Sequence, residues 1–283
     1  MGKLGCAIVI GAVATYYAIT GHHESKRFEE KYHLPQEIAV IETNQPYETR
    51  IVGQELEKIV KTKDIDFSGE VILKTDRYRY VKSSDWLPSR VVGHVCSIPG
   101  KIFFLDWNYG LGQDEDRSKS ALAMLEEHKE IKDLTLRLNH NEAFYDIYRM
   151  FTEKKLRDRN NIFARALIGI PLSIGDEIWA EFSRGSYYNP LTQTVVCYSN
   201  IESVTAHELG HHKDFQRFDY DWIYMLTRAI PPVTLYQEWK ASSNACDIMS
   251  KEDGWQFYRY LIPAFATYVL ATLWMFSSKS DDD

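Results

Sequence analysis

One pentapeptide, His207-Glu208-Leu209-Gly210-His211, restricts the fold of this chain more than any other stretch. In a helix, residues four apart project from the same face, so the two histidines would lie side by side. Two imidazoles placed in this way can bind a single zinc ion, and the intervening Glu208 can act on a water molecule beside the metal. The pentapeptide therefore predicts a zinc-binding helix.

The surrounding residues favour that helix. Ser199 followed three residues later by Glu202 fits a capping box, in which the two side chains satisfy the free amides of the first turn. No proline interrupts the segment, and apolar residues recur at roughly helical spacing. These apolar residues are Ile201, Val204, Leu209 and Phe215.

A catalytic zinc site uses three protein ligands and an open position, so one ligand remains to be found. The pattern with a third histidine ten residues after His207 is absent, because that position holds Arg217 and the required glycine is replaced by Asp214. Asp214, Asp219 and Asp221 are possible third ligands close to the helix. Each of them would need a different path of the loop that follows.

Glu238 is the preferred third ligand. It lies in a second predicted helix, residues 235–249, one turn before Ser242. Ala241 and Ala245 in this helix are small enough to let it pack closely against the metal helix.

The two motifs together, His-Glu-x-x-His and Glu-x-x-Ala-Ser, resemble those of the gluzincin metallopeptidases. The resemblance covers residues 187–249 and is strongest to the membrane-associated class that includes the CaaX prenyl protease. It implies that His207, His211 and Glu238 bind Zn²⁺ and that Glu208 is the catalytic general base.

In one place the chain departs from that family. Many gluzincins have an aspartate one turn after the ligand glutamate, where it orients a metal-bound histidine, and this chain has Ser242 there. A hydroxyl group can accept the imidazole hydrogen bond without the charge of a carboxylate, so we expect lower metal affinity.

The predicted fold is α+β, a mostly helical zincin-like domain with a small sheet, flanked by terminal apolar helices. We assign residues 1–21 to a membrane anchor, 22–258 to the metallopeptidase domain, and 259–283 to an apolar helix with an acidic tail. Hydrophobic periodicity predicts helices at 51–61, 118–138 and 141–159, strands at 70–81, 90–97, 101–107 and 194–198, and a turn at 185–190. The strand at 194–198 is expected to be a sheet edge that pairs with an extended peptide.

Two further expectations concern side-chain orientation. The charges of residues 141–159 are interpreted as a solvated face, opposite an apolar face made of Phe144, Ile147, Tyr148 and Phe151. Residues 162–174 are apolar but too short to span a bilayer, so a core element or an interfacial segment is expected there.

Both ends of the chain carry apolar stretches. Residues 4–20 are uncharged and fit a retained membrane anchor, and residues 261–276 slightly favour a second membrane span over a buried helix. Basic residues are more numerous on the inner sides of both stretches, which places the main domain in the cytoplasm or mitochondrial matrix, at a bacterial or mitochondrial inner membrane.

Composition excludes other classes of function. The net charge is −7, from 40 acidic and 33 basic residues, and there is no basic stripe, so nucleic acid is not an expected partner. The four cysteines are scattered without a Cys-x-x-Cys pair, which indicates a reducing compartment.

Two functions follow from these observations. The first is a membrane-anchored zinc-dependent metallopeptidase that hydrolyses peptide bonds in protein or peptide substrates by a zinc-activated water, with Glu208 as general base. The alternative is an inactive zincin-fold subunit with a structural role in a membrane protein complex. For the first, the oxyanion would be stabilised by one of four candidates, namely Tyr220, Tyr224, His212 and Arg228.

Overall fold

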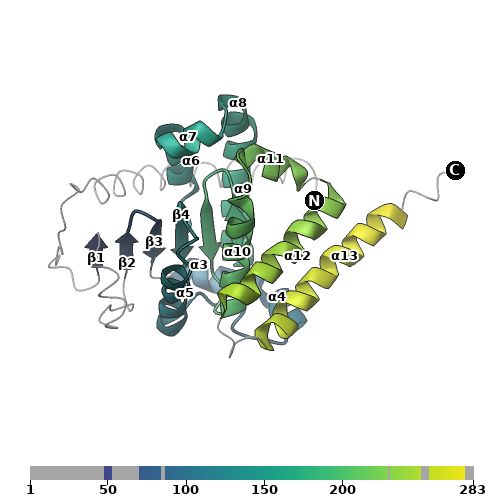
Figure 1. Ribbon diagram of the computed structural model, residues 1–283. Coiled ribbons are helices and arrows are strands. Elements are labelled where there is room, and N and C mark those ends of the chain that lie inside the picture. Colours follow the sequence, from purple (N-terminus) through teal and green to yellow (C-terminus); the bar gives the residue numbers. More distant parts are fainter. Residues whose placement is uncertain (1–47, 53–69, 84–86, 229, 250–254, 278–283) are drawn as a thin grey trace, which may run out of the picture.

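The computed structural model describes residues 48–52, 70–83, 87–228, 230–249 and 255–277. Within these residues a six-stranded sheet lies among helices (Figure 1), so the predicted mixture of many helices with a small sheet is confirmed. The strands are β1 Glu48–Val52, β2 Glu70–Lys74, β3 Tyr78–Lys82, β4 Leu134–Leu138, β5 Tyr187–Asn189 and β6 Thr194–Cys197. The first helices are α3 Leu87–Cys96, α4 Ile98–Phe104, α5 Glu115–Glu127, α6 Ala143–Thr152, α7 Lys154–Arg159 and α8 Ile162–Ala164. The later ones are η1 Arg165–Gly169, α9 Ile170–Ser183, α10 Glu202–Phe215, α11 Asp221–Thr227, α12 Pro231–Ile248, η3 Phe257–Leu261 and α13 Ile262–Ser277.

The strand order in the sheet is β1-β2-β3-β4-β6-β5. The predicted strand 70–81 is the antiparallel pair β2 and β3, and the predicted strand 194–198 is β6, which runs parallel to β4. The edge position expected for this strand is wrong, because β5 pairs with the other side of β6 in antiparallel register. The segment expected to be only a turn therefore supplies the edge strand of the sheet.

Helices pack on both faces of the sheet. Successive side chains of a strand point to opposite faces, so Val195 and Cys197 join the core shared with α5 and α10, while Val196 packs with Ala180 of α9. The His-Glu-x-x-His pentapeptide of α10 therefore lies on a helix that one sheet face supports directly.

Two predicted strands are helices. Residues 90–96 belong to α3, Ser97 is the residue before α4, and residues 101–104 belong to α4. The valines that suggested a strand, Val91 and Val95, are exposed, while Gly93 lies against the side chain of Arg184. Pro99 does not break α4, because a proline in the first turn of a helix has no intrahelical hydrogen bond to lose.

The predicted helices at 118–138 and 51–61 are also corrected. The first ends at Glu127 with α5, and its last five residues form β4, whose Leu134, Leu136 and Leu138 alternate with Thr135 and Arg137. The second begins within strand β1, and residues 53–61 lie outside the described part of the chain. Leucines alternate with polar residues in β4, and this period of two is typical of a strand, although the composition of the segment suits a helix.

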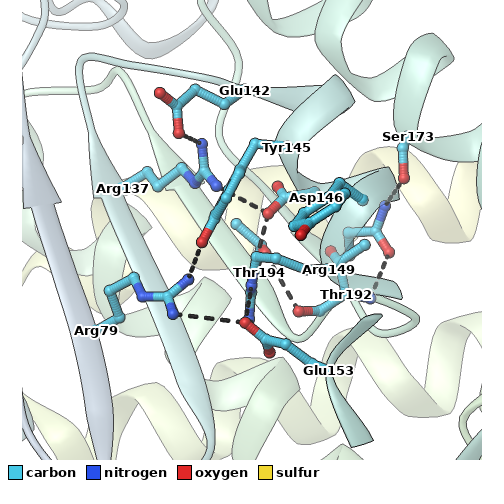
Figure 2. Close-up of polar contacts among 12 residues, drawn as sticks. Arg79, Arg137, Glu142, Tyr145, Asp146, Arg149, Glu153, Ser173, Thr192 and Thr194 are labelled. Carbon is cyan, nitrogen blue, oxygen red and sulfur yellow. Dashed lines mark hydrogen bonds and ion pairs between the residues drawn. The ribbon is translucent and has the colours of Figure 1, made fainter. Parts of the chain in front are cut away.

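Helix α6 turns its charged residues inward, the reverse of the predicted arrangement. Asp146 and Arg149 are buried and Tyr148 is exposed. The Arg137 guanidinium, on the adjacent strand β4, donates to Asp146 at 2.8 Å and to Glu142 at 2.7 Å (Figure 2). Arg149 donates to Asp146 and to Glu153, both at 2.9 Å. Hydrogen-bonded opposite charges offset the cost of burial, which explains why these residues lie inside.

The buried charges Arg137, Glu142, Asp146 and Arg149, together with the partly exposed Arg79 and Glu153, form one cluster, which we call the ion cluster. Three arginines and three carboxylates make it electrically neutral as a group. It ties strands β3 and β4 to helix α6 and the residue that follows it (Figure 2).

The ion cluster predicts acid-sensitive stability. Burial opposes ionisation of Glu142 and Glu153, but nearby arginines outweigh it and hold the pKa of each carboxyl below 4.5. As pH falls, the unfolded chain therefore takes up protons at these groups before the folded chain does. We expect the free energy of unfolding, from urea titrations, to decline as pH falls below about 4.5. A smaller decline is expected for Glu153→Gln, and a value constant down to about pH 3 would contradict the assignment.

The apolar segment 162–174 is not a core element. It forms α8, η1 and the start of α9, with Phe163 and Leu167 exposed. On α9 the inward residues include Ser173 and Glu177, whereas Trp179 points outward and is 65% exposed. This helix therefore presents apolar side chains to the outside.

The terminal apolar stretches have different outcomes. Residues 4–20 lie outside the described residues. Residues 261–276 form the last residue of η3 and most of α13, a helix of 16 residues that lies beside α12 (Figure 1). Among the helices described here, none has the length and apolar character needed to cross a membrane.

Candidate metal centre

Helix α10 carries the pentapeptide, as predicted. Ala206, Leu209 and Phe215 are completely buried in the core that α10 shares with the sheet. The sheet therefore fixes the rotation of α10 about its axis, and His207 and His211 project towards α12.

The predicted capping box is wrong. The residue before α10 is Ile201, in extended conformation, and the buried Ser199 hydroxyl makes no hydrogen bond within the described residues. The Glu202 carboxylate instead accepts hydrogen bonds from Arg117, at 2.6 Å, and from Ser120. The helix begins two residues later than the capping box requires, with Ile201 rather than Ser199 as the N-cap, and Arg117 and Ser120 of α5 bind the first residue of α10.

Helix α12 crosses α10 at Gly210. A Cβ atom at Gly210 would lie 2.3 Å from the carbonyl oxygen of Ala241, so this approach requires glycine. Ala241 and Ala245 are completely buried, in agreement with the expected close packing. Asn244 adds a 2.9 Å hydrogen bond from its amide to the carbonyl oxygen of Gly210. This crossing brings Glu238 to the histidines.

Three potential ligand atoms meet between the two helices. His207 Nε2 lies 3.2 Å from Glu238 Oε2, and His211 Nε2 lies 3.4 Å from Glu238 Oε1. One ligand atom from each of the three residues lies within 4.8 Å of the others. The structure thus brings together the three residues predicted as metal ligands.

The remaining ring nitrogens are also held. Ser242 Oγ lies 3.2 Å from His207 Nδ1, and the Tyr224 hydroxyl lies 3.2 Å from His211 Nδ1. A hydrogen bond at Nδ1 fixes ring orientation and leaves Nε2 free to bind a metal. Two imidazoles and one carboxylate arranged in this way fit a divalent metal ion. Ser242 occupies the place that the sequence assigned to it.

The groups around Glu238 keep it ionised. Burial works to raise its pKa, but the hydrogen-bonding rings of His211 and His207 hold the pKa well below its usual range. Burial lowers the pKa of His211 to about 4, so this imidazole is neutral, the state that metal binding requires. Arg228 donates a 2.6 Å hydrogen bond to Glu238 Oε1 and compensates its charge.

Glu208 lines the same cavity as His207 and Glu238 but makes no hydrogen bond to the three proposed ligands. It is 8% exposed, and no hydrogen bond or ion pair of its carboxylate occurs within the described residues. Burial raises its pKa to about 7, although His207 acts in the opposite direction. A carboxyl group without a partner and with this pKa can accept and return a proton.

The alternative ligands lie elsewhere. Asp221 is buried and accepts hydrogen bonds from Arg159 and Asn160. Asp214 faces Arg217, and Asp219 is exposed on the turn that follows α10. None of the three aspartates belongs to the cluster of donor atoms.

The four residues predicted as candidate oxyanion donors also lie outside the lining of the cavity. Tyr224 is bonded to His211 and Arg228 to Glu238, while Tyr220 is exposed. His212 is completely buried and contacts the Tyr188 hydroxyl and a backbone carbonyl. None of the four lines the cavity at the candidate metal centre.

Sequence reasoning missed Tyr268. It comes from α13 and lines the cavity together with His207 and Glu208. Tyr268 is 41% exposed, and its partial burial and the charge of Glu238 raise its pKa, so the phenol keeps its proton and can donate a hydrogen bond there. Tyr268 is far from Glu238 along the chain, and no sequence pattern connects the two.

Protein-family models, curated proteins and solved structures were compared with the chain, and none of them matches it. The geometry of the cluster and the chemistry of its side chains therefore carry the functional argument.

Ser242 provides a test of the ring orientation. Ser242→Ala removes the contact at His207 Nδ1 and is expected to weaken zinc binding about 10- to 100-fold, measured by competition with a chelator. Ser243→Ala, its neighbour on α12, is the matched control and should bind zinc like the unaltered protein. Equal affinity in both variants would show that the hydroxyl does not orient the histidine.

Proposed function

We propose that the protein is a zinc-dependent metallopeptidase with a zincin-like fold of the gluzincin type. One observation carries the proposal: His207, His211 and Glu238 converge from two helices while the unpartnered carboxylate of Glu208 faces the same cavity. Two histidines and one carboxylate are a ligand set of catalytic zinc sites, which leave one position open.

His207, His211 and Glu238 would hold the zinc ion. When bound, it supplies Lewis-acid chemistry, because it acidifies water and polarises a carbonyl group. Glu208 accepts a proton from the attacking water and delivers it to the departing nitrogen. The water oxygen forms a bond to the carbonyl carbon, the carbon–nitrogen bond breaks, and a carboxylate and an amine leave. Ser242 and Tyr224 keep the two imidazoles in place.

The edge strand β5 offers a way to position the substrate. Ser186, the residue before β5, lines the cavity, and β5 pairs with β6 on one side only within the described sheet. An extended peptide that adds to the outer side of β5 by backbone hydrogen bonds would run towards Glu208.

The test uses the purified full chain. We expect one bound zinc ion per chain by elemental analysis and new peptide termini by mass spectrometry after incubation with a denatured protein. Chelation should abolish hydrolysis and added zinc should restore it. Glu238→Gln, which keeps the size of the side chain, should bind far less zinc. Unchanged zinc occupancy would mean that one of the aspartates, and not Glu238, is the third ligand.

The same experiment distinguishes the proposed peptidase from the alternative, structural function. Zinc bound at full occupancy without hydrolysis of any substrate would favour an inactive subunit with a structural role in a membrane complex. Against that alternative stands Glu208, since a structural zinc site needs no buried, unpartnered carboxylate beside it.

We also propose that the protein is attached to a membrane, with the main domain on the cytoplasmic or mitochondrial-matrix side. The proposal rests on the apolar residues 4–20, and the exposed Phe163, Leu167 and Trp179 are compatible with it. The full chain should sediment with phospholipid vesicles, and a chain without residues 1–21 should do so much less. Failure of the full chain to sediment would refute membrane attachment.

A further inference from the structure

The candidate metal centre opens into a cavity of about 160 Å³. Its polar lining includes His207, Glu208, Glu238 and Ser242. Most of the remaining lining is apolar or aromatic and comes from three segments outside the zinc motifs, α4, η3 and α13. These segments contribute Phe104, Tyr260, Leu261, Ala264, Phe265 and Tyr268.

The apolar wall is fixed before any ligand arrives. The Phe104 ring lies 5.3 Å from that of Tyr109 and 5.9 Å from that of Tyr260, centroid to centroid. The Tyr260 hydroxyl donates to Asp106, and Arg259 donates to the carbonyl oxygen of Leu105 at 3.1 Å. These bonds tie the end of α4 to η3, so the wall is a preformed surface.

The size of the cavity limits what can enter. A cavity of about 150 Å³ lined by apolar side chains holds one benzene molecule. The space here therefore suits one aromatic ring or one large aliphatic group. Within the described part of the chain, no lysine or arginine lines the cavity, so a carboxylate would be buried there without a partner. A small side chain would leave much of the apolar surface uncovered.

We propose that this cavity selects the substrate: it takes one large apolar side chain, of the leucine or phenylalanine class, from a residue that adjoins the scissile bond. The inference rests on the proposed peptidase function, since Glu208 and two of the proposed zinc ligands, His207 and Glu238, line the same cavity. Helix α13, close to the end of the chain, is then part of the substrate-binding site.

Burial of a leucine or phenylalanine side chain in the cavity should increase the rate of hydrolysis. Peptides that differ only at the residue beside the cleaved bond should be hydrolysed with kcat/KM about 10- to 100-fold higher for phenylalanine or leucine than for alanine. Aspartate at that position should be poorer than alanine. A peptide library read by mass spectrometry identifies on which side of the bond the preference lies.

Variants of α13 test the wall directly. Ala264→Phe fills the cavity and should remove the preference for phenylalanine over alanine. Leu270→Phe adds the same ring on an exposed part of the helix and should leave the preference for phenylalanine unchanged. Phe265→Ala enlarges the cavity and should raise kcat/KM for the tryptophan peptide relative to the leucine peptide. Thermal melting and zinc content confirm that each variant is folded.

The outcomes separate the two proposals. Two results would overturn substrate selection by this cavity and leave the proposed peptidase function standing. One is hydrolysis of all peptides at equal rates, and the other is an unchanged side-chain preference in both Ala264→Phe and Phe265→Ala. No hydrolysis of any peptide by the zinc-loaded protein would overturn the peptidase function, and the inference with it.

Discussion

Glu208→Gln is expected to hydrolyse peptides about 10²- to 10⁴-fold more slowly than the unaltered protein while it binds zinc equally well. The amide cannot accept the proton of the attacking water, and the three ligand side chains are unchanged. The measurement is kcat at saturating peptide together with the zinc content of the same sample.

Two further measurements complete this experiment: the unfolding temperature of Glu208→Gln and the activity of a surface control variant. The Glu208 carboxylate is buried without a partner among the described residues, so a neutral amide there should leave the unfolding temperature unchanged or raise it. Glu127→Gln, on an exposed position of α5, is the matched control and should have normal activity. A Glu208→Gln variant with full activity would remove this residue from the mechanism.

Gly210→Ala should impair both folding and the metal centre. The new Cβ would lie 2.3 Å from the carbonyl oxygen of Ala241, and neither helix backbone can move without disturbing the core. Overpacking of this kind costs about 1–3 kcal/mol, which corresponds to a fall in unfolding temperature of roughly 2–12 °C. A displaced α12 also moves Glu238 away from the histidines, so zinc affinity should fall.

Gly175→Ala is the matched control for that variant. A Cβ atom added at Gly175, in helix α9, would enter open space with no neighbouring atom within 4 Å. Alanine there should therefore stabilise the protein by about 0.5–1 kcal/mol through helix propensity. Thermal unfolding and chelator competition on both variants check the prediction. Equal stability of Gly210→Ala and Gly175→Ala would mean that α10 and α12 do not cross so closely.

The local part of the candidate site could be predicted from the sequence. Histidines four residues apart need only a helix to share a face, and α10 provides it although its predicted cap does not form. The helix around Glu238 was also predicted, and it begins at Pro231, since prolines are tolerated in a first turn.

The fold between residues 87 and 152 could not be predicted in the same way. Runs of valine and phenylalanine in α3 and α4 resemble strands, yet they lie on helices, where Val91, Val95 and Phe103 are exposed. In α6 the charged residues point inward because Arg137 reaches them from β4. Partners of this kind come from distant parts of the chain, and hydrophobic periodicity contains no information about them.

By itself, the sequence determined which residues can supply the chemistry and placed two of them on one helix face, because that relation depends only on a spacing of four. The tertiary structure alone decided that Glu238 lies within 3.4 Å of both histidines and that Phe104, Tyr260 and Tyr268 line the same cavity. The physical reason is that these distances depend on how closely helices pack, and at Gly210 that closeness is set by a single absent side-chain atom.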